Sequence, residues 1–142
     1  MNKKRLVILL MALLVLCLSG CKKSNFGVRV NEDMNVEINA ENASNDMFGA
    51  TSGFEVAEGQ KVYIESALTK GEISVRINAV SLTDIDAKPE ELLEAVTGTD
   101  NTVLDLKISG IETSEYELEP GTYSVSANVL TKADGKVIIT VR

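Results

Sequence analysis

The sequence contains no histidine and no tryptophan, and only two cysteines and two prolines among its 142 residues. Without histidine, the chain cannot build a Ser-His-Asp triad or the usual histidine-containing zinc sites. A phosphate-binding loop is missing as well, because Gly49 and Gly53 near Ser52 are not followed by Gly-Lys-Ser/Thr and a helix. The chemistry that remains available to the chain is therefore mainly that of carboxylates.

Both cysteines lie within the first 21 residues, in a segment of unusual composition. Residues 3–5 are cationic, and residues 6–18 form a run without any charge. A stable membrane-spanning helix needs about 20 apolar residues, so this run is short for a permanent span and typical of a signal-peptide core. The small residues at 19–20 follow where a signal peptidase requires little bulk.

The segment Leu18-Ser19-Gly20-Cys21 resembles the lipobox of bacterial prolipoproteins. The resemblance implies cleavage between Gly20 and Cys21 and a diacylglyceryl group on the Cys21 sulfur, with or without an acyl group on the new amino terminus. It also implies a cell-membrane lipid anchor on the extracytoplasmic face: the cell surface of a one-membrane bacterium, or otherwise the periplasmic face or the outer membrane. Cys17 would leave with the signal peptide, so the mature chain would have no thiol for disulfide or redox chemistry. The alternative is a stray thiol at Cys21 behind an ordinary secretory signal.

Removal of residues 1–20 changes the size and charge that bear on function. It leaves 122 residues (142 minus 20), enough for one domain with a core. It also leaves 11 Lys+Arg against 21 Asp+Glu, a side-chain charge of −10. Because so acidic a surface repels phosphate backbones, we expect no nucleic-acid partner. Lys22 and Lys23 either add about 1 kcal/mol each toward anionic headgroups or are solvated residues of a tether.

Alternation of apolar and polar residues dominates the body of the chain. Eight short runs with a period of two are separated by Gly-containing pairs typical of turns. The runs cover 34–40, 54–56, 62–64, 73–77, 104–108, 116–118, 123–129 and 137–141, and the pairs are Glu58-Gly59, Lys70-Gly71, Ser109-Gly110, Pro120-Gly121 and Asp134-Gly135. The pattern predicts an all-β domain over residues 34–142, an antiparallel β-sandwich of about seven to nine strands.

Two segments depart from the alternation. Pro89 followed by acidic residues, with Gly98 behind them, predicts one short helix near residues 89–97. Residues 21–33 are expected to be the lipidated cysteine and a tether, although alternating apolar residues between positions 26 and 30 also fit a strand.

Three segments carry a second resemblance. "FEVAEGQKVYI", "KGEISVRI" and "ELEPGTYSVSANVLTKADGKVIITV" are similar to the body of small, uncharacterised extracytoplasmic lipoproteins of Gram-positive bacteria. The resemblance implies a β-sandwich closed by the last strand, and it implies no activity.

Candidate binding residues are few. Asp84 and Asp86, with acidic residues nearby, offer oxygen ligands for Ca²⁺, against the alternative of a solvated acidic loop that caps the helix. Tyr63, Tyr116 and Tyr123 offer rings for sugars, although tyrosines on alternating strands are more often core or corner residues.

The expected function is that of a non-enzymatic, lipid-anchored β-sandwich without an assigned specific activity, which serves as a protein-binding or envelope-interaction module. The alternatives are a Ca²⁺-dependent or glycan-binding module and an enzyme resembling carboxylate-dependent glycoside hydrolases. The enzyme needs a pair of carboxyl groups, and any chain with 21 acids contains such pairs.

Replacing Cys21 tests the lipid anchor. Cys21→Ala removes the only sulfur that the lipobox would acylate, so we expect the variant to incorporate no labelled fatty acid and to be left uncleaved or released. Cys17→Ala is the matched control and should be labelled and retained as in the unmodified protein. Normal lipid labelling and membrane retention of Cys21→Ala would show that the lipobox interpretation is wrong.

Overall fold

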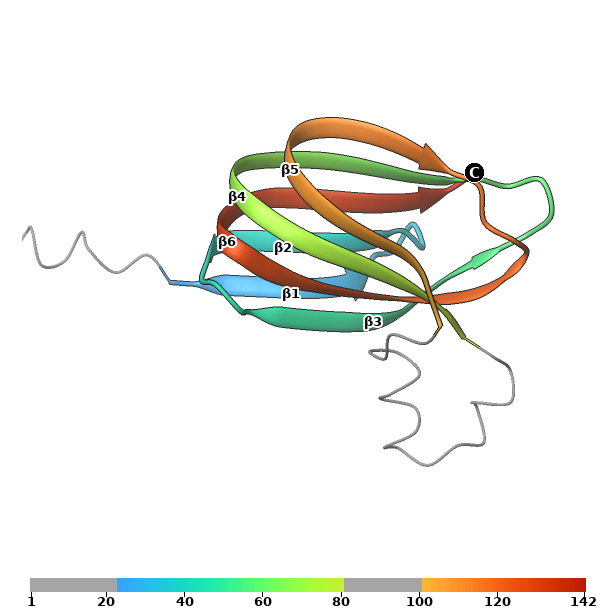
Figure 1. The fold of residues 1–142 in the computed structure, drawn as a ribbon, viewed down its shortest axis with the longest axis horizontal. Coiled ribbons are helices and arrows are strands. Elements are labelled where there is room, and N and C mark those ends of the chain that lie inside the picture. Colours follow the sequence, from blue (N-terminus) through green and yellow to red (C-terminus); the bar gives the residue numbers. More distant parts are fainter. Residues whose placement is uncertain (1–22, 81–100) are drawn as a thin grey trace, which may run out of the picture.

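The computed structural model describes residues 23–80 and 101–142, and this part of the chain consists of antiparallel β-strands and their connections (Figure 1). The strands are β1 Asn25–Val30, β2 Val36–Ala43, β3 Phe48–Val56, β4 Val62–Val80, β5 Thr102–Tyr116 and β6 Gly121–Val141. The all-β, antiparallel class is as predicted. Within these ranges there is no helix long and apolar enough to cross a membrane. The helix expected near residues 89–97 lies outside the described residues.

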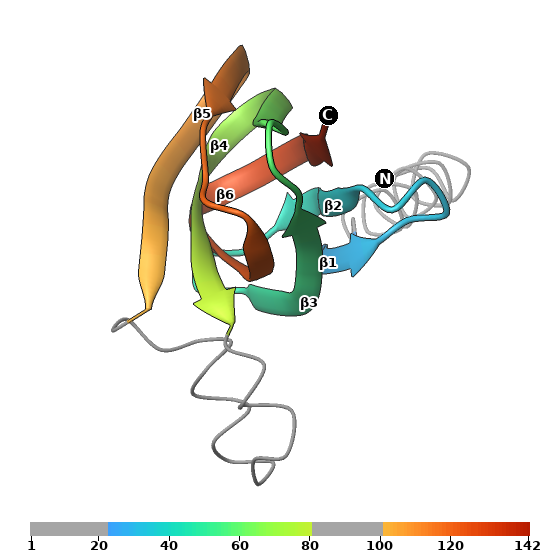
Figure 2. The same cartoon turned by 90° about the vertical axis from the view of Figure 1, so that its right-hand side faces the viewer.

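All six strands belong to one sheet that is organised around β6. The order is β1-β2-β6-β4-β5, and β3 also pairs with β6. One edge of β6 pairs with β4 over most of its length, whereas the other edge pairs first with β3 and then with β2. Figure 2 shows the sheet curled, with β4 and β5 on one side and β1 to β3 on the other. The sheet does not close, because β1, β3 and β5 each pair with only one other strand of the described chain.

The described residues form six strands where about seven to nine were expected, because three predicted turns are bends inside long strands. Gly71 in β4, Gly110 in β5 and Gly135 in β6 have positive φ values of 82°, 71° and 132°. The pairing of β4 shifts register beside these glycines and then continues on both sides. A bulge adds a residue and bends a strand without ending it, so each of the three strands runs on where a turn was predicted.

The bulge in β4 also explains which residues form the core. Before Gly71 the buried apolar side chains are at even positions, such as Val62 and Ile64, and after it they are at odd positions, such as Ile73 and Val75. The pairing of β4 with β6 shifts by one residue across the bend, and the shift with β5 is also odd, so the side-chain phase reverses and both halves of β4 direct their apolar side chains into the same core. That core is mainly aliphatic, and its largest fully buried apolar side chains are Ile38, Ile64, Ile73, Ile77, Ile139, Val36, Val62, Val75, Val125, Val129 and Val137.

Part of the segment expected to be a tether is a strand. β1 occupies Asn25–Val30, and its apolar side chains Phe26, Val28 and Val30 pack against the core. The connection to β2 is closed by Asn31, whose side-chain oxygen accepts hydrogen bonds from the backbone N–H groups of Asp33 (3.0 Å) and Asn35 (3.1 Å). The folded domain therefore begins at β1 and not at residue 34. The two other predicted turns are connections, since Glu58-Gly59 joins β3 to β4 and Pro120 precedes β6.

Replacing the bend glycines with alanine separates backbone strain from steric collision. A Cβ at Gly71 or Gly135 would collide with the carbonyl oxygen of Lys132 or Ala67, whereas a Cβ at Gly110 meets open space. We expect Gly110→Ala to lower the free energy of unfolding by about 1 kcal/mol through its positive φ alone. Gly71→Ala and Gly135→Ala should cost more, about 2–4 kcal/mol.

Gly27→Ala is the matched control for this series. Gly27 has neither a positive φ nor an atom within 4 Å of the added Cβ, so its urea unfolding midpoint should stay close to that of the unmodified protein. Equal midpoints for all four alanine variants would contradict the assignment of Gly71 and Gly135 to obligatory bends.

Candidate functional site

A buried carboxylate on the outer face of the sheet is the most strongly perturbed ionisable group in the described part of the chain. Glu37 lies on β2 between the core residues Val36 and Ile38, so the strand period directs its side chain away from the core. The Glu37 side chain is nevertheless only 10% exposed. An acid so far out of water needs partners that compensate its charge.

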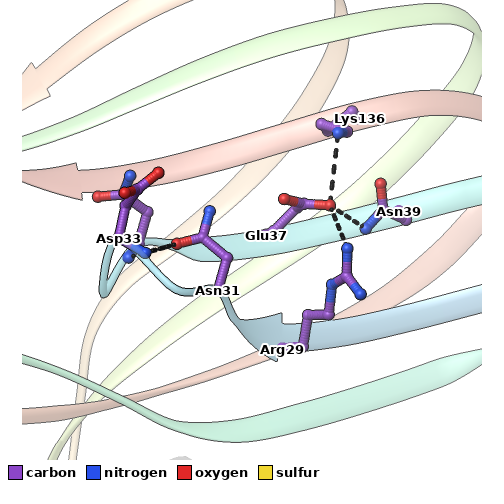
Figure 3. Close-up of polar contacts among 7 residues, drawn as sticks. Arg29, Asn31, Asp33, Glu37, Asn39 and Lys136 are labelled. Atoms are coloured by element: carbon purple, nitrogen blue, oxygen red, sulfur yellow. Dashed lines mark hydrogen bonds and ion pairs between the residues drawn. The ribbon is translucent and has the colours of Figure 1, made fainter.

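Three side chains from three strands converge on one oxygen of Glu37 (Figure 3). Its Oε1 accepts hydrogen bonds from Asn39 Nδ2 at 2.7 Å and Arg29 Nη2 at 3.0 Å, and Lys136 Nζ lies 3.4 Å away. The strand register produces this arrangement, because Arg29 is opposite Glu37 in the β1–β2 pair and Lys136 is opposite Asn39 in the β2–β6 pair. We call these four residues the Glu37 cluster.

The Glu37 cluster holds its carboxylate in the charged state. The hydrogen bonds from Asn39 and then Arg29 lower the pKa of Glu37 from 4.5 to about 2, while burial acts in the opposite direction. A general acid or base works best with a pKa near the operating pH, so Glu37 is poorly placed to transfer protons at neutral pH. The cluster is suited to holding charge and hydrogen bonds.

An open hollow of about 560 Å³ lies against the Glu37 cluster. It is lined by charged and amide side chains from β1, β2 and β6, including Asn25 and Glu41 beside the cluster itself. With Arg29 and Lys136 opposing Glu37 and Glu41, the hollow carries no net charge. In residues 23–80 and 101–142, no group of three His, Cys, Asp or Glu side chains is arranged to hold a metal ion.

The tyrosines suggested for sugar stacking have other surroundings. Tyr123 is buried, stacks on Phe54 with ring centroids 5.7 Å apart, and donates its hydroxyl hydrogen to the Glu119 carbonyl at 2.5 Å. Burial raises the pKa of Tyr123, with a further contribution from the charge of Glu119. Tyr63 lies beneath the guanidinium of Arg142, 5.0 Å from its ring centroid. Tyr123 is therefore a core residue, in agreement with the corner interpretation.

The two ends of the domain differ in charge. The end where β4, β5 and β6 bend, here called the bend end, comprises residues 23–24, 44–47, 68–72, 109–111 and 130–135. It carries three cations and three acids. The opposite end, here called the far end, comprises the connections 31–35, 57–61 and 117–120 with Arg142. It carries two cations and five acids. Figure 1 shows these connections gathered opposite the bends.

The sequence-predicted sites and the Glu37 cluster do not overlap. Gly20, Cys21, Asp84 and Asp86 lie outside the described residues. The cluster was missed because Arg29 was assigned to a tether. A hairpin between residues 26–30 and 36–40 would have placed Arg29 opposite Glu37, whereas the sequence contains no signal that would have added Lys136.

Comparisons with known proteins add little to this site. No family model matches the chain, and no curated protein matches it. One solved structure, a crystal structure of Drosophila melanogaster CENP-C bound to CAL1, is similar at 12% sequence identity and a TM-score of 0.31, covering 99% of this chain and 98% of that chain. A likeness at this identity and score carries no argument about function.

The stability of the Glu37 cluster should depend on pH in a defined direction. The folded-state pKa of Glu37 lies below its unfolded value. The charged Glu37 side chain therefore makes its full contribution to the free energy of unfolding above about pH 4.5, and this contribution is lost as the pH falls toward 2. We expect Glu37→Gln to lower the free energy of unfolding by about 1–3 kcal/mol at pH 7. The loss is no larger because the exposed Arg29 side chain is screened by solvent, which weakens its ion pair with Glu37. The difference between the two proteins should shrink between pH 4.5 and 2.

Urea unfolding measured from pH 2 to 7 checks this prediction. Glu58→Gln, an exposed acid in the β3–β4 connection, is the matched control and should leave stability unchanged across the range. A Glu37→Gln deficit that stays constant down to pH 2 would show that the charge of Glu37 is not what stabilises the cluster.

Proposed function

We propose that the chain is a lipid-anchored extracytoplasmic protein whose β-domain is a non-enzymatic binding module with a protein partner. The observation that carries this proposal is the position of β1 relative to the lipobox. β1 begins at Asn25, four residues after Cys21, and four residues of extended chain span at most about 14 Å. A lipid on Cys21 would therefore hold the folded domain close against the membrane surface.

The titration behaviour of the described residues supports binding over catalysis. Hydrogen bonds within the Glu37 cluster lower the pKa of Glu37, and the hydrogen bond from Lys61 lowers the pKa of Glu115. Its hydrogen bonds to Glu115 and then Glu117 raise the pKa of Lys61, and burial raises the pKa of Tyr123. All four shifts move away from neutrality, whereas a glycosidase acid needs a carboxyl group with a raised pKa.

The shape of the sheet supports a protein as the partner. In the described part of the chain β5 pairs only with β4, so its 15 residues leave one backbone edge available to an added strand. We further infer that the two halves of the curled sheet serve as the layers of a β-sandwich, since both direct aliphatic side chains into one core.

Charge favours a partner with a basic surface. The far end exposes Glu32, Glu58 and Glu119, none of which forms an ion pair with another described residue. Complementary charge accelerates association and excludes like-charged partners. The proposed partner therefore presents Lys or Arg residues to the far end.

Neutralising the far end tests the partner proposal. In Glu32→Gln/Glu58→Gln/Glu119→Gln, the domain keeps its fold but loses three exposed charges, so we expect a chemically crosslinked complex with an envelope protein to be lost from native membranes. The control Glu41→Gln/Asp46→Asn/Glu112→Gln removes the same charge from exposed acids elsewhere and should keep the complex. Equal crosslinking of both triple variants would contradict a basic partner at the far end.

A further inference from the structure

The point at which the chain enters the fold lies at the bend end. Ser24 Oγ is 3.1 Å from Ser44 Oγ and donates to Met47 Sδ at 3.4 Å, so the chain before β1 contacts the β2–β3 connection. The Met47 carbonyl accepts a hydrogen bond from the Val129 N–H at 2.9 Å, just before the bend of β6. Figure 1 shows the start of β1 and the bends of β4, β5 and β6 at the same end.

The bend end holds cations that form no ion pair with any acid of residues 23–80 and 101–142. Among the described residues, five of the nine cations form ion pairs with acids, namely Arg29, Lys61, Arg76, Lys136 and Arg142. Lys23, Lys70 and Lys132 form none, and all three belong to the bend end; Lys107 on β5 is the fourth. The acids of this end include Asp134, whose Oδ1 accepts a hydrogen bond from the Asn42 N–H at 2.5 Å.

An exposed apolar side chain accompanies these lysines. Ile111 follows the bend glycine of β5 and is 84% exposed, the largest exposed fraction among the big apolar side chains of the described chain. An apolar side chain near Lys residues is the combination that enters the boundary between headgroups and acyl chains of a membrane.

We propose that the bend end is the membrane-contacting surface of the anchored domain. Anionic lipid headgroups pair with Lys23, Lys70 and Lys132, and Ile111 enters the headgroup boundary. An anionic lipid surface repels a domain of net charge −10. At physiological salt, screening limits this electrostatic repulsion to about 8–10 Å, so the charges of the end nearest the membrane decide whether it can approach. The balanced bend end is therefore the end that can approach, and the acidic far end is directed away from the membrane. This inference rests on the proposed lipid anchor at Cys21.

The absence of tryptophan provides a direct probe of orientation. Ile111→Trp and Met34→Trp each create a single tryptophan in the full lipidated protein, at the bend end and at the far end respectively; Met34 is 76% exposed. The proteins are reconstituted into vesicles of phosphatidylglycerol and phosphatidylcholine with brominated acyl chains. We expect the tryptophan fluorescence of Ile111→Trp to be quenched at least about twofold more strongly than that of Met34→Trp.

A charge reversal tests the role of the lysines. In the Ile111→Trp protein, Lys132→Glu should reduce quenching in anionic vesicles, whereas the matched reversal Lys107→Glu should leave it unchanged. Hydrogen exchange gives a second readout without any substitution: residues 130–135 should exchange more slowly in vesicles than in detergent, and residues 117–120 should not.

Separate measurements distinguish the anchor from the orientation. Flotation with vesicles and fatty-acid labelling report the anchor, and quenching of the floated protein reports the orientation. If the protein floats but Met34→Trp is quenched as strongly as Ile111→Trp, and residues 130–135 gain no protection, the orientation is wrong and the anchor stands. If the protein carries no lipid and does not float, the anchor is wrong and this inference is wrong with it.

Discussion

The close approach of the paired β4 and β6 backbones at Gly71 and Gly135 is the constraint on which the rest of the structure depends. At each of these positions the backbone of the other strand occupies the space that a Cβ would need. This close approach lets both strands bend while they remain paired, so that a single sheet curls over its own aliphatic core. The accompanying bulge reverses the side-chain phase of β4. Val62 and Ile73 are therefore buried in the same core, although one has an even and the other an odd residue number.

The same bends separate the molecule into two chemically different ends. Because β4, β5 and β6 turn back at one end, three short connections rich in acids are gathered at the other. The bend end keeps equal numbers of cations and acids, and it is also where the chain enters β1. The proposed anchor at Cys21 would thus place the balanced surface near the membrane and the acidic surface away from it. This division links the proposed anchor to the proposed partner.

The Glu37 cluster connects the edge strand β1 to the centre of the sheet. β1 is an edge strand that pairs with β2 alone, and it is the first strand after the proposed anchor. In the proposed anchored protein, a pull on the chain before β1 would therefore act on the pairing of β1 with β2. Arg29 ties β1 to the Glu37 carboxylate, and Lys136 ties that carboxylate to the central strand β6. A carboxylate that stays charged to about pH 2 keeps both contacts over the whole physiological range.

The sequence by itself determined the antiparallel all-β class and the apolar face of most strands, because the alternation in runs such as Ile73, Val75 and Ile77 is a local property of the chain. It also located the connection at Glu58-Gly59. It did not distinguish that turn from the bends at Gly71 and Gly135, since a glycine that favours positive φ is compatible with either. Only the neighbouring strand decides, by continuing its hydrogen bonds past the glycine. Pairing of distant strands likewise brings Lys136 to Glu37, so the strand count and the cluster were decided by the tertiary structure.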